Sequence, residues 1–131
     1  MIILDTNICI YVIKRRPMSV LTRFENVPNG ELGISVITYA ELQFGVEKSS
    51  AKKQNQIVLD EFVDRLEVLD WDRAAANEYA ILRTRLQKQG LMIGPLDLQI
   101  AAHAKSRGDV LVTNNLREFN RVPALKLENW V

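Results

Sequence analysis

The chain has 131 residues, of which 47% are hydrophobic and 25% are charged. This length suits one compact domain, and we expect residues 1–131 to form a single one. The composition is typical of a globular protein, which excludes a disordered chain and a fibrous one. The formal net charge is only +1, whereas a dedicated non-specific nucleic-acid binder would be far more basic. If this protein handles nucleic acid, basic patches must hold it while acids elsewhere cancel their charge.

The sequence favours a protein of the cytoplasm. No apolar run approaches the ~20 residues needed to cross a bilayer, so no membrane contact is expected. The N-terminal segment Met1–Asp5 has no basic region and reaches a charge at once, unlike a signal peptide. Cys9 is the only cysteine, so no internal disulfide can form, and this fits a reducing compartment. Its apolar neighbours make Cys9 a small buried hydrophobic residue in this interpretation.

Short apolar runs alternate with helical patterns along the whole chain. Pro17 breaks or restarts the first helix, and Gly90 and Gly108 are stop signals. In chain order we expect strands at Met1–Leu4, Leu32–Ser35, Val68–Leu69, Val110–Thr113 and Leu125–Leu127, and helices at Ile8–Ile13, Ile37–Glu47, Ala51–Leu66, from Asp72 to Gly90, and from Pro95 to Ser106.

This order of elements predicts an α/β fold with a short, mainly parallel central sheet and helices on both faces. In such sheets the ligand site lies beyond the carboxyl ends of the strands. Asp5 directly follows the first predicted strand, and Asn114 and Asn115 directly follow the Val110–Thr113 strand. We therefore expect these side chains on one edge of the sheet.

Three of the sixteen acids differ from the rest, because Asp5, Glu41 and Asp97 have mostly apolar sequence neighbours. Two carboxylates ~5 Å apart repel by about 3 kcal/mol at an effective dielectric constant of ~20. Either one of them takes up a proton or a cation lies between them. Magnesium is the usual cation for such oxygen ligands, and it binds one or two carboxylates while keeping several waters. It can activate water and bind a phosphate.

Each of these acids also has a purely structural explanation. Asp5 could cap the first helix. Glu41 could pair with a nearby lysine or arginine. Asp97 could be a first-turn acid that the helix dipole favours. Each explanation is adequate alone, but all three together, at strand ends or on adjoining helices, are a less economical account than one shared site.

Four motifs of this chain resemble the PIN domain, and more narrowly the VapC toxins of bacterial toxin–antitoxin pairs. The resemblance runs from Met1 to Trp130, and the four motifs occur in order in a chain of suitable length. The motifs are Leu4-Asp5-Thr6-Asn7, Ser35-Val36-Ile37-Thr38-Tyr39-Ala40-Glu41-Leu42, Gly94-Pro95-Leu96-Asp97 and Val112-Thr113-Asn114-Asn115-Leu116-Arg117-Glu118-Phe119.

The resemblance implies a PIN-like three-layer domain and a metal-dependent endoribonuclease. Asp5 and Asp97 match the family's main magnesium ligands, with Mn²⁺ as a substitute, and Glu41 matches its third acid. Many PIN domains carry an aspartate where Asn115 stands here. An amide can hydrogen-bond a metal-bound water but brings no charge, and Glu118, one helical turn further on, is the candidate replacement. The fourth position of the site is therefore open between Asn115 and Glu118.

The resemblance also implies partners. A VapB antitoxin would inhibit the enzyme, and the chain would form a homodimer and a toxin–antitoxin hetero-oligomer that contacts operator DNA only through the antitoxin. The closest likeness is to enteric toxins that cut initiator tRNA in its anticodon region, so tRNA is the implied substrate. From the charge of the site we expect an antitoxin arginine near the acids, and an apolar groove beside Phe44 and Ile8–Ile13.

Other residues have less specific interpretations. His103 is the only histidine and is expected to be a packing or surface residue rather than a ligand. The basic run Lys14-Arg15-Arg16, like Arg83, Arg85 and Lys88, either grips phosphates or forms a solvated face. Tyr11, Tyr39, Phe44 and Tyr79 fall at helical positions, where packing in the core or against a partner is favoured over base stacking.

Two other classes of function remain open. A phosphatase with an aspartate nucleophile would need a second aspartate where Asn7 stands, and a receiver domain phosphorylated on Asp5 would need an acidic pair before it and a late-strand lysine. Neither requirement is met. A pure interaction module would hold an antitoxin without catalysis, and the intact acid triad argues against it.

Overall fold

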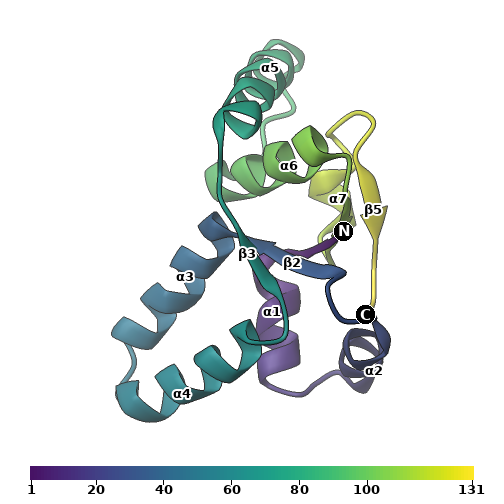
Figure 1. Ribbon diagram of the computed structural model, residues 1–131. Helices are drawn as coiled ribbons and strands as arrows, with labels where there is room; N and C mark the ends of the chain where they lie inside the picture. The colour runs from purple at the N-terminus through teal and green to yellow at the C-terminus, as the bar shows by residue number, and fades with distance from the viewer.

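The computed structural model describes residues 1–131 as five strands and seven helices (Figure 1). The strands are β1 (Ile2–Leu4), β2 (Leu32–Ser35), β3 (Glu67–Leu69), β4 (Val110–Val112) and β5 (Lys126–Glu128). The helices are α1 (Thr6–Ile13), α2 (Met18–Asn26), α3 (Val36–Glu47), α4 (Lys52–Val63), α5 (Arg73–Gln89), α6 (Pro95–Arg107) and α7 (Leu116–Phe119).

The strands form one sheet in the order β3-β2-β1-β4-β5, and every neighbouring pair is parallel. The predicted α/β class is confirmed, with a sheet that is wholly rather than mainly parallel. The chain first adds β2 and β3 on one side of β1, and then crosses back through α5 and α6 to place β4 on the other side. The strand order therefore reverses between β1 and β4, which is where ligands bind in sheets of this kind.

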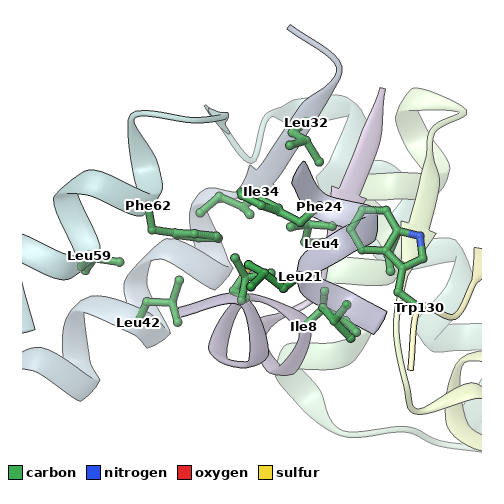
Figure 2. Packing of buried hydrophobic residues seen from close by; sticks show 14 of the residues in the cluster. Leu4, Ile8, Leu21, Phe24, Leu32, Ile34, Leu42, Leu59, Phe62 and Trp130 are labelled. Carbon is green, nitrogen blue, oxygen red and sulfur yellow. The ribbon is translucent and has the colours of Figure 1, made fainter. Parts of the chain in front are cut away.

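Each face of the sheet has its own hydrophobic cluster, because successive strand residues point to opposite faces. Leu4 of β1 belongs to the cluster beneath α1–α4, whereas its neighbour Ile3 belongs to the cluster beneath α5–α7. Figure 1 shows these two sets of helices on opposite sides of the sheet. Figure 2 shows the first cluster, in which Phe24 and Phe62 lie close together and Trp130 closes one end.

Most predicted elements are confirmed, and their ends differ by a few residues. The predicted helix Ala51–Leu66 is shorter, because α4 ends at Val63 and β3 begins at Glu67. Gly90 and Gly108 end α5 and α6 in the left-handed conformation, as expected. Two helices, α2 and α7, were not predicted as elements; α2 buries Val20, Leu21 and Phe24 on one side. None of the helices has the length and apolar character that crossing a membrane requires.

Candidate active site

Asp5 lies at the point where the strand order reverses. It follows β1 directly, and its backbone N–H donates to the carbonyl of Val112 in β4, 3.0 Å away. The side chain is only 4% exposed. One carboxylate oxygen accepts from the N–H of Ile8 at 2.9 Å, so Asp5 also caps α1. The capping role that sequence reasoning left open is therefore present, together with the buried location expected of a site residue.

The surroundings of Asp5 act on its pKa in both directions. Burial raises the pKa of the carboxyl, and the negative charge of Glu41 adds to this effect. Hydrogen bonds from the Thr113 hydroxyl and from the backbone N–H groups of Ile8 and Asn7 lower it in part. The net direction is upward, so a negative charge at Asp5 is costly unless a cation is near.

Glu41 lies on α3 and faces α1. The Thr6 hydroxyl donates to the Oε1 atom of Glu41 at 2.8 Å, and the Thr6 and Thr38 hydroxyl oxygens are 3.3 Å apart. None of the protein's salt bridges includes Glu41. The alternative in which Glu41 pairs with a lysine or an arginine is therefore wrong, and Thr6 instead links this acid to the helix that Asp5 caps.

Asp97 and Glu118 lie in the first turns of α6 and α7, where the charge of each acts on the other. The pKa of Asp97 rises to about 6, because the group is partly buried and because Glu118, Asp5 and Glu41 all repel a further negative charge. The charges of all three other acids therefore act on the carboxyl of Asp97. It stands in the first turn of α6, where the helix dipole favours an acid, but the dipole does not account for the three acids gathered around it.

Burial alone would raise the pKa of Glu118, but hydrogen bonds reverse the direction and lower it. The Gly94 N–H donates to Oε1 of Glu118 at 2.5 Å, and the amide of Asn115 donates to Oε2 at 2.8 Å. Of the two residues considered for the fourth position, Glu118 contacts Asp97 and Asn115 orients Glu118.

The acids of this site are possible ligands for a divalent cation. No three histidine, cysteine, aspartate or glutamate side chains lie close enough together to ligate one ion as they stand. The chemistry nevertheless fits magnesium, which needs only one or two carboxylates and completes its shell with water. A cation beside Asp5 and Asp97 would offset the burial and the repulsion between acids that raise the pKa of both groups.

A groove of about 870 Å³ opens beside the acids and runs between α1, α3 and α4. Thr6, Glu41 and Leu96 line it near the site, and Val58 and Leu59 line it further away. Phe44, expected beside such a groove, is among the lining residues and is 63% exposed. The groove is thus acidic at one end and mostly apolar along its length.

Sequence reasoning missed several polar residues that shape the site. Thr6, Thr38 and Thr113 hydrogen-bond the acids or one another, and the backbone of Gly94 binds Glu118. Thr6 and Thr113 each stand within two residues of a strand end, which is a usable signal. The role of Gly94 carries no signal in its own residue type, because its backbone N–H does the binding.

Known proteins are similar to this chain in sequence and in fold. The family profile of the PIN domain matches residues 2–125. Ribonuclease VapC2 of Haemophilus influenzae is 52% identical over 128 residues, covering 98% of this chain and 96% of that protein. The tRNA(fMet)-specific endonuclease VapC of Shigella flexneri is 50% identical over 127 residues, covering 97% and 96%. The VapBC2 complex of Rickettsia felis, solved on a promoter DNA fragment, matches with a TM-score of 0.93 and 47% identity over 100% of both chains. The chain therefore belongs to the PIN-domain family and, within it, to the VapC ribonucleases.

Proposed function

We propose that this chain is the toxin of a toxin–antitoxin pair and cleaves tRNA with the help of magnesium, initiator tRNA being its substrate. The observation that carries the proposal is the group of four acids, Asp5, Glu41, Asp97 and Glu118, at the strand-order reversal, with the pKa of Asp97 raised by burial and by the charges of the other three. Relatives from Shigella flexneri and Salmonella typhimurium, 50% and 48% identical, are named tRNA(fMet)-specific endonucleases. A tRNA substrate also fits a location in the cytoplasm.

In this proposal Asp5 and Asp97 hold the ion, and Glu41 and Glu118 complete the negative pocket. When bound, magnesium supplies an activated water and neutralises the charge of the phosphate under attack. Other groups of the chain position the acids. The Thr6 hydroxyl donates to Glu41, and the Gly94 N–H and the Asn115 amide donate to Glu118 and favour its charged form.

We also propose that a VapB-type antitoxin inhibits the enzyme through the groove between α1, α3 and α4. An amphipathic helix would place its apolar side on Ile10, Leu42 and Val58, which line the groove. An arginine of the antitoxin would reach the acids, because its planar guanidinium binds carboxylates with two hydrogen bonds. The homodimer and the contact with operator DNA through the antitoxin belong to the same proposal; the Rickettsia felis complex was solved with promoter DNA.

The test is a cleavage assay with the purified chain and a mixture of tRNAs. We expect initiator tRNA to be cut in its anticodon region with Mg²⁺ or Mn²⁺, and to stay intact after chelation. Asp5→Asn and Asp97→Asn are expected to abolish cutting while the circular dichroism spectrum stays that of the wild type. Equal cutting of all tRNAs would contradict the substrate, and undiminished activity of folded Asp97→Asn would contradict the metal site.

The alternatives now have less support. Membership of the VapC ribonucleases disfavours a phosphatase or a receiver domain, both of which also lack required residues. An interaction module without catalysis predicts no specific metal binding, whereas we expect one Mn²⁺-dependent signal that disappears in Asp5→Asn. A metal titration of the two proteins separates these possibilities.

A further inference from the structure

His103 is the only histidine of the chain, and it is 1% exposed. The sequence predicted a packing or surface residue, and the side chain is indeed buried, but it also makes a specific hydrogen bond. Its Nδ1 atom lies 2.8 Å from the hydroxyl oxygen of Ser35. No buried polar side-chain atom of the protein lacks a partner. A leucine would fill similar space without this bond, so packing does not explain why a histidine stands here.

The protonation state follows from the surroundings of the ring. Burial, and then the charge of Arg107, lowers the pKa of His103, so the ring is neutral at neutral pH. The Ser35 oxygen accepts from the N–H of Ile37 at 3.1 Å, which leaves the Ser35 hydroxyl hydrogen to be donated to the neutral Nδ1. These bonds connect the α3 backbone, through Ser35, to His103 of α6.

The two ends of this series belong to the helices that carry the acids. Ser35 is the N-cap of α3, and Glu41 follows it by six residues. His103 lies on α6, and Asp97 precedes it by six residues. Six helical residues span about 9 Å, so the bond joins two rigid helices at similar distances from the acids. A shift of α6 against α3 would change the separation of Asp97 from Glu41.

A second bond ties α6 to the segment that follows β3. The indole N–H of Trp71 donates to the carbonyl of Gln99 at 3.0 Å, one helical turn before His103. The Ser35 bond is different, because among these contacts it alone joins α6 to α3.

We propose that His103 is a positioning residue of the acidic site, whose bond to Ser35 holds Asp97 on α6 at a fixed separation from Glu41 on α3. The inference rests on the proposed metal-dependent function. It assigns no contact between His103 and the ion or the RNA; the imidazole acts only through the two helices. Loss of the Ser35–His103 bond is therefore expected to lower the affinity for the metal beyond any effect of a less stable fold.

The experiment is a titration of the metal-free protein with Mn²⁺ in the absence of RNA, followed by electron paramagnetic resonance. For His103→Leu we expect the apparent dissociation constant to rise about tenfold. His103→Asn keeps an acceptor near the position of Nδ1, so its constant is expected to stay within about threefold of the wild type. Ser35→Ala removes the same bond and also the cap of α3, so its constant is expected to rise at least as much as that of His103→Leu. The double variant is expected to be no worse than Ser35→Ala, because the shared bond is already lost.

The matched control is Leu82→Ala, because Leu82 on α5 is fully buried but lies outside the acidic site. It is expected to lower the melting temperature and leave Mn²⁺ affinity unchanged. If His103→Leu and Ser35→Ala lower the melting temperature but bind Mn²⁺ like the wild type, the proposal is wrong. If His103→Leu does not fold, Ser35→Ala and His103→Asn decide the question alone. Failure of the wild type to bind Mn²⁺ would contradict the metal-dependent function itself, and the positioning role with it.

Discussion

The carboxyl of Asp97 differs from a surface aspartate because Glu118, Asp5 and Glu41 all raise its pKa, in addition to burial. The folded protein therefore holds a proton on Asp97 more firmly than the unfolded chain does. In the metal-free protein this raised pKa lowers the free energy of unfolding once the proton has left. The loss is absent below the ordinary pKa of 3.8 and fully present above about 6. The metal-free protein carries this penalty at neutral pH.

The first prediction concerns stability. Asp97→Asn removes the charge but keeps a group that can donate to Glu118, so at pH 7.5 without metal the variant should be more stable than the wild type by about 1–2 kcal/mol. The advantage should shrink as the pH falls toward 4, because the wild-type carboxyl then becomes neutral as well. Urea unfolding in EDTA at both pH values measures this. An equal difference at pH 4 and pH 7.5 would show that charge is not the cause.

The second prediction concerns competition between protons and metal. Because the pKa of Asp97 is about 6, a proton occupies this carboxyl at pH 5 and must leave before the carboxylate can bind a cation. The apparent affinity for Mn²⁺ should therefore fall by roughly tenfold for each pH unit below 6, since one proton is exchanged. Titrations from pH 5 to pH 8 check the slope. Asp97→Asn serves as the control, and any binding left in it should depend less on pH in this range.

At the scale of elements, the site depends on how helices are joined near the acids. Thr6 in the first turn of α1 donates to Glu41 of α3, which joins the helix capped by Asp5 to the helix of the third acid. The third prediction is that Thr6→Val, which keeps the shape but removes the hydroxyl, costs about 1 kcal/mol of stability. It should also lower kcat about tenfold, because Glu41 loses its donor. Thr6→Ser is the matched control and should retain most activity, and a fully active Thr6→Val would show that this bond has no part in the chemistry.

The groove between α1, α3 and α4 gives the fourth prediction. Phe44 lines it and is largely exposed, with only the Lys48 ammonium over its ring, 5.0 Å from the centroid. Phe44→Ser should leave cleavage of tRNA unchanged and weaken antitoxin binding at least tenfold, since a central aromatic contact is lost. Calorimetry with the cognate antitoxin measures the affinity. Ile81→Ser, on the exposed side of α5, is the control for a general surface effect, and tight binding by Phe44→Ser would place the antitoxin elsewhere.

Element types were predictable where a local signal existed. Apolar runs marked the strands, and Asp72, Gly90 and Gly108 marked helix ends. The helix α2 was missed because Pro17 obscured its start, although its buried residues Val20, Leu21 and Phe24 follow a helical spacing that was available in the sequence. The helix α7 has only four residues, too few for a periodic pattern, and the packing of Phe119 in the core stabilises it.

At the scale of the whole molecule, the sheet topology explains which part of the site could be predicted. Asp5 and the segment after β4 were expected on one edge, because strand ends of a parallel sheet lie together. The partners of Glu41, Asp97 and His103 were not predictable, because Thr6, Glu118 and Ser35 lie 21 to 68 residues away from them in the chain. Such contacts depend on the three-dimensional packing of helices.

The last prediction concerns the ends of the cut RNA and follows from the whole arrangement. Cleavage through the substrate's own 2′-hydroxyl needs a general base and leaves a cyclic phosphate. His103 cannot be this base, because it is 1% exposed and its Nδ1 atom is bonded to Ser35, so the ring cannot reach the RNA. The four acids instead suit attack by water with a metal ion. We therefore expect a 5′-phosphate and a 3′-hydroxyl, and no cutting in excess EDTA. Mapping the termini of cut initiator tRNA decides this, since a 2′,3′-cyclic phosphate would show that the acids are not the catalytic groups.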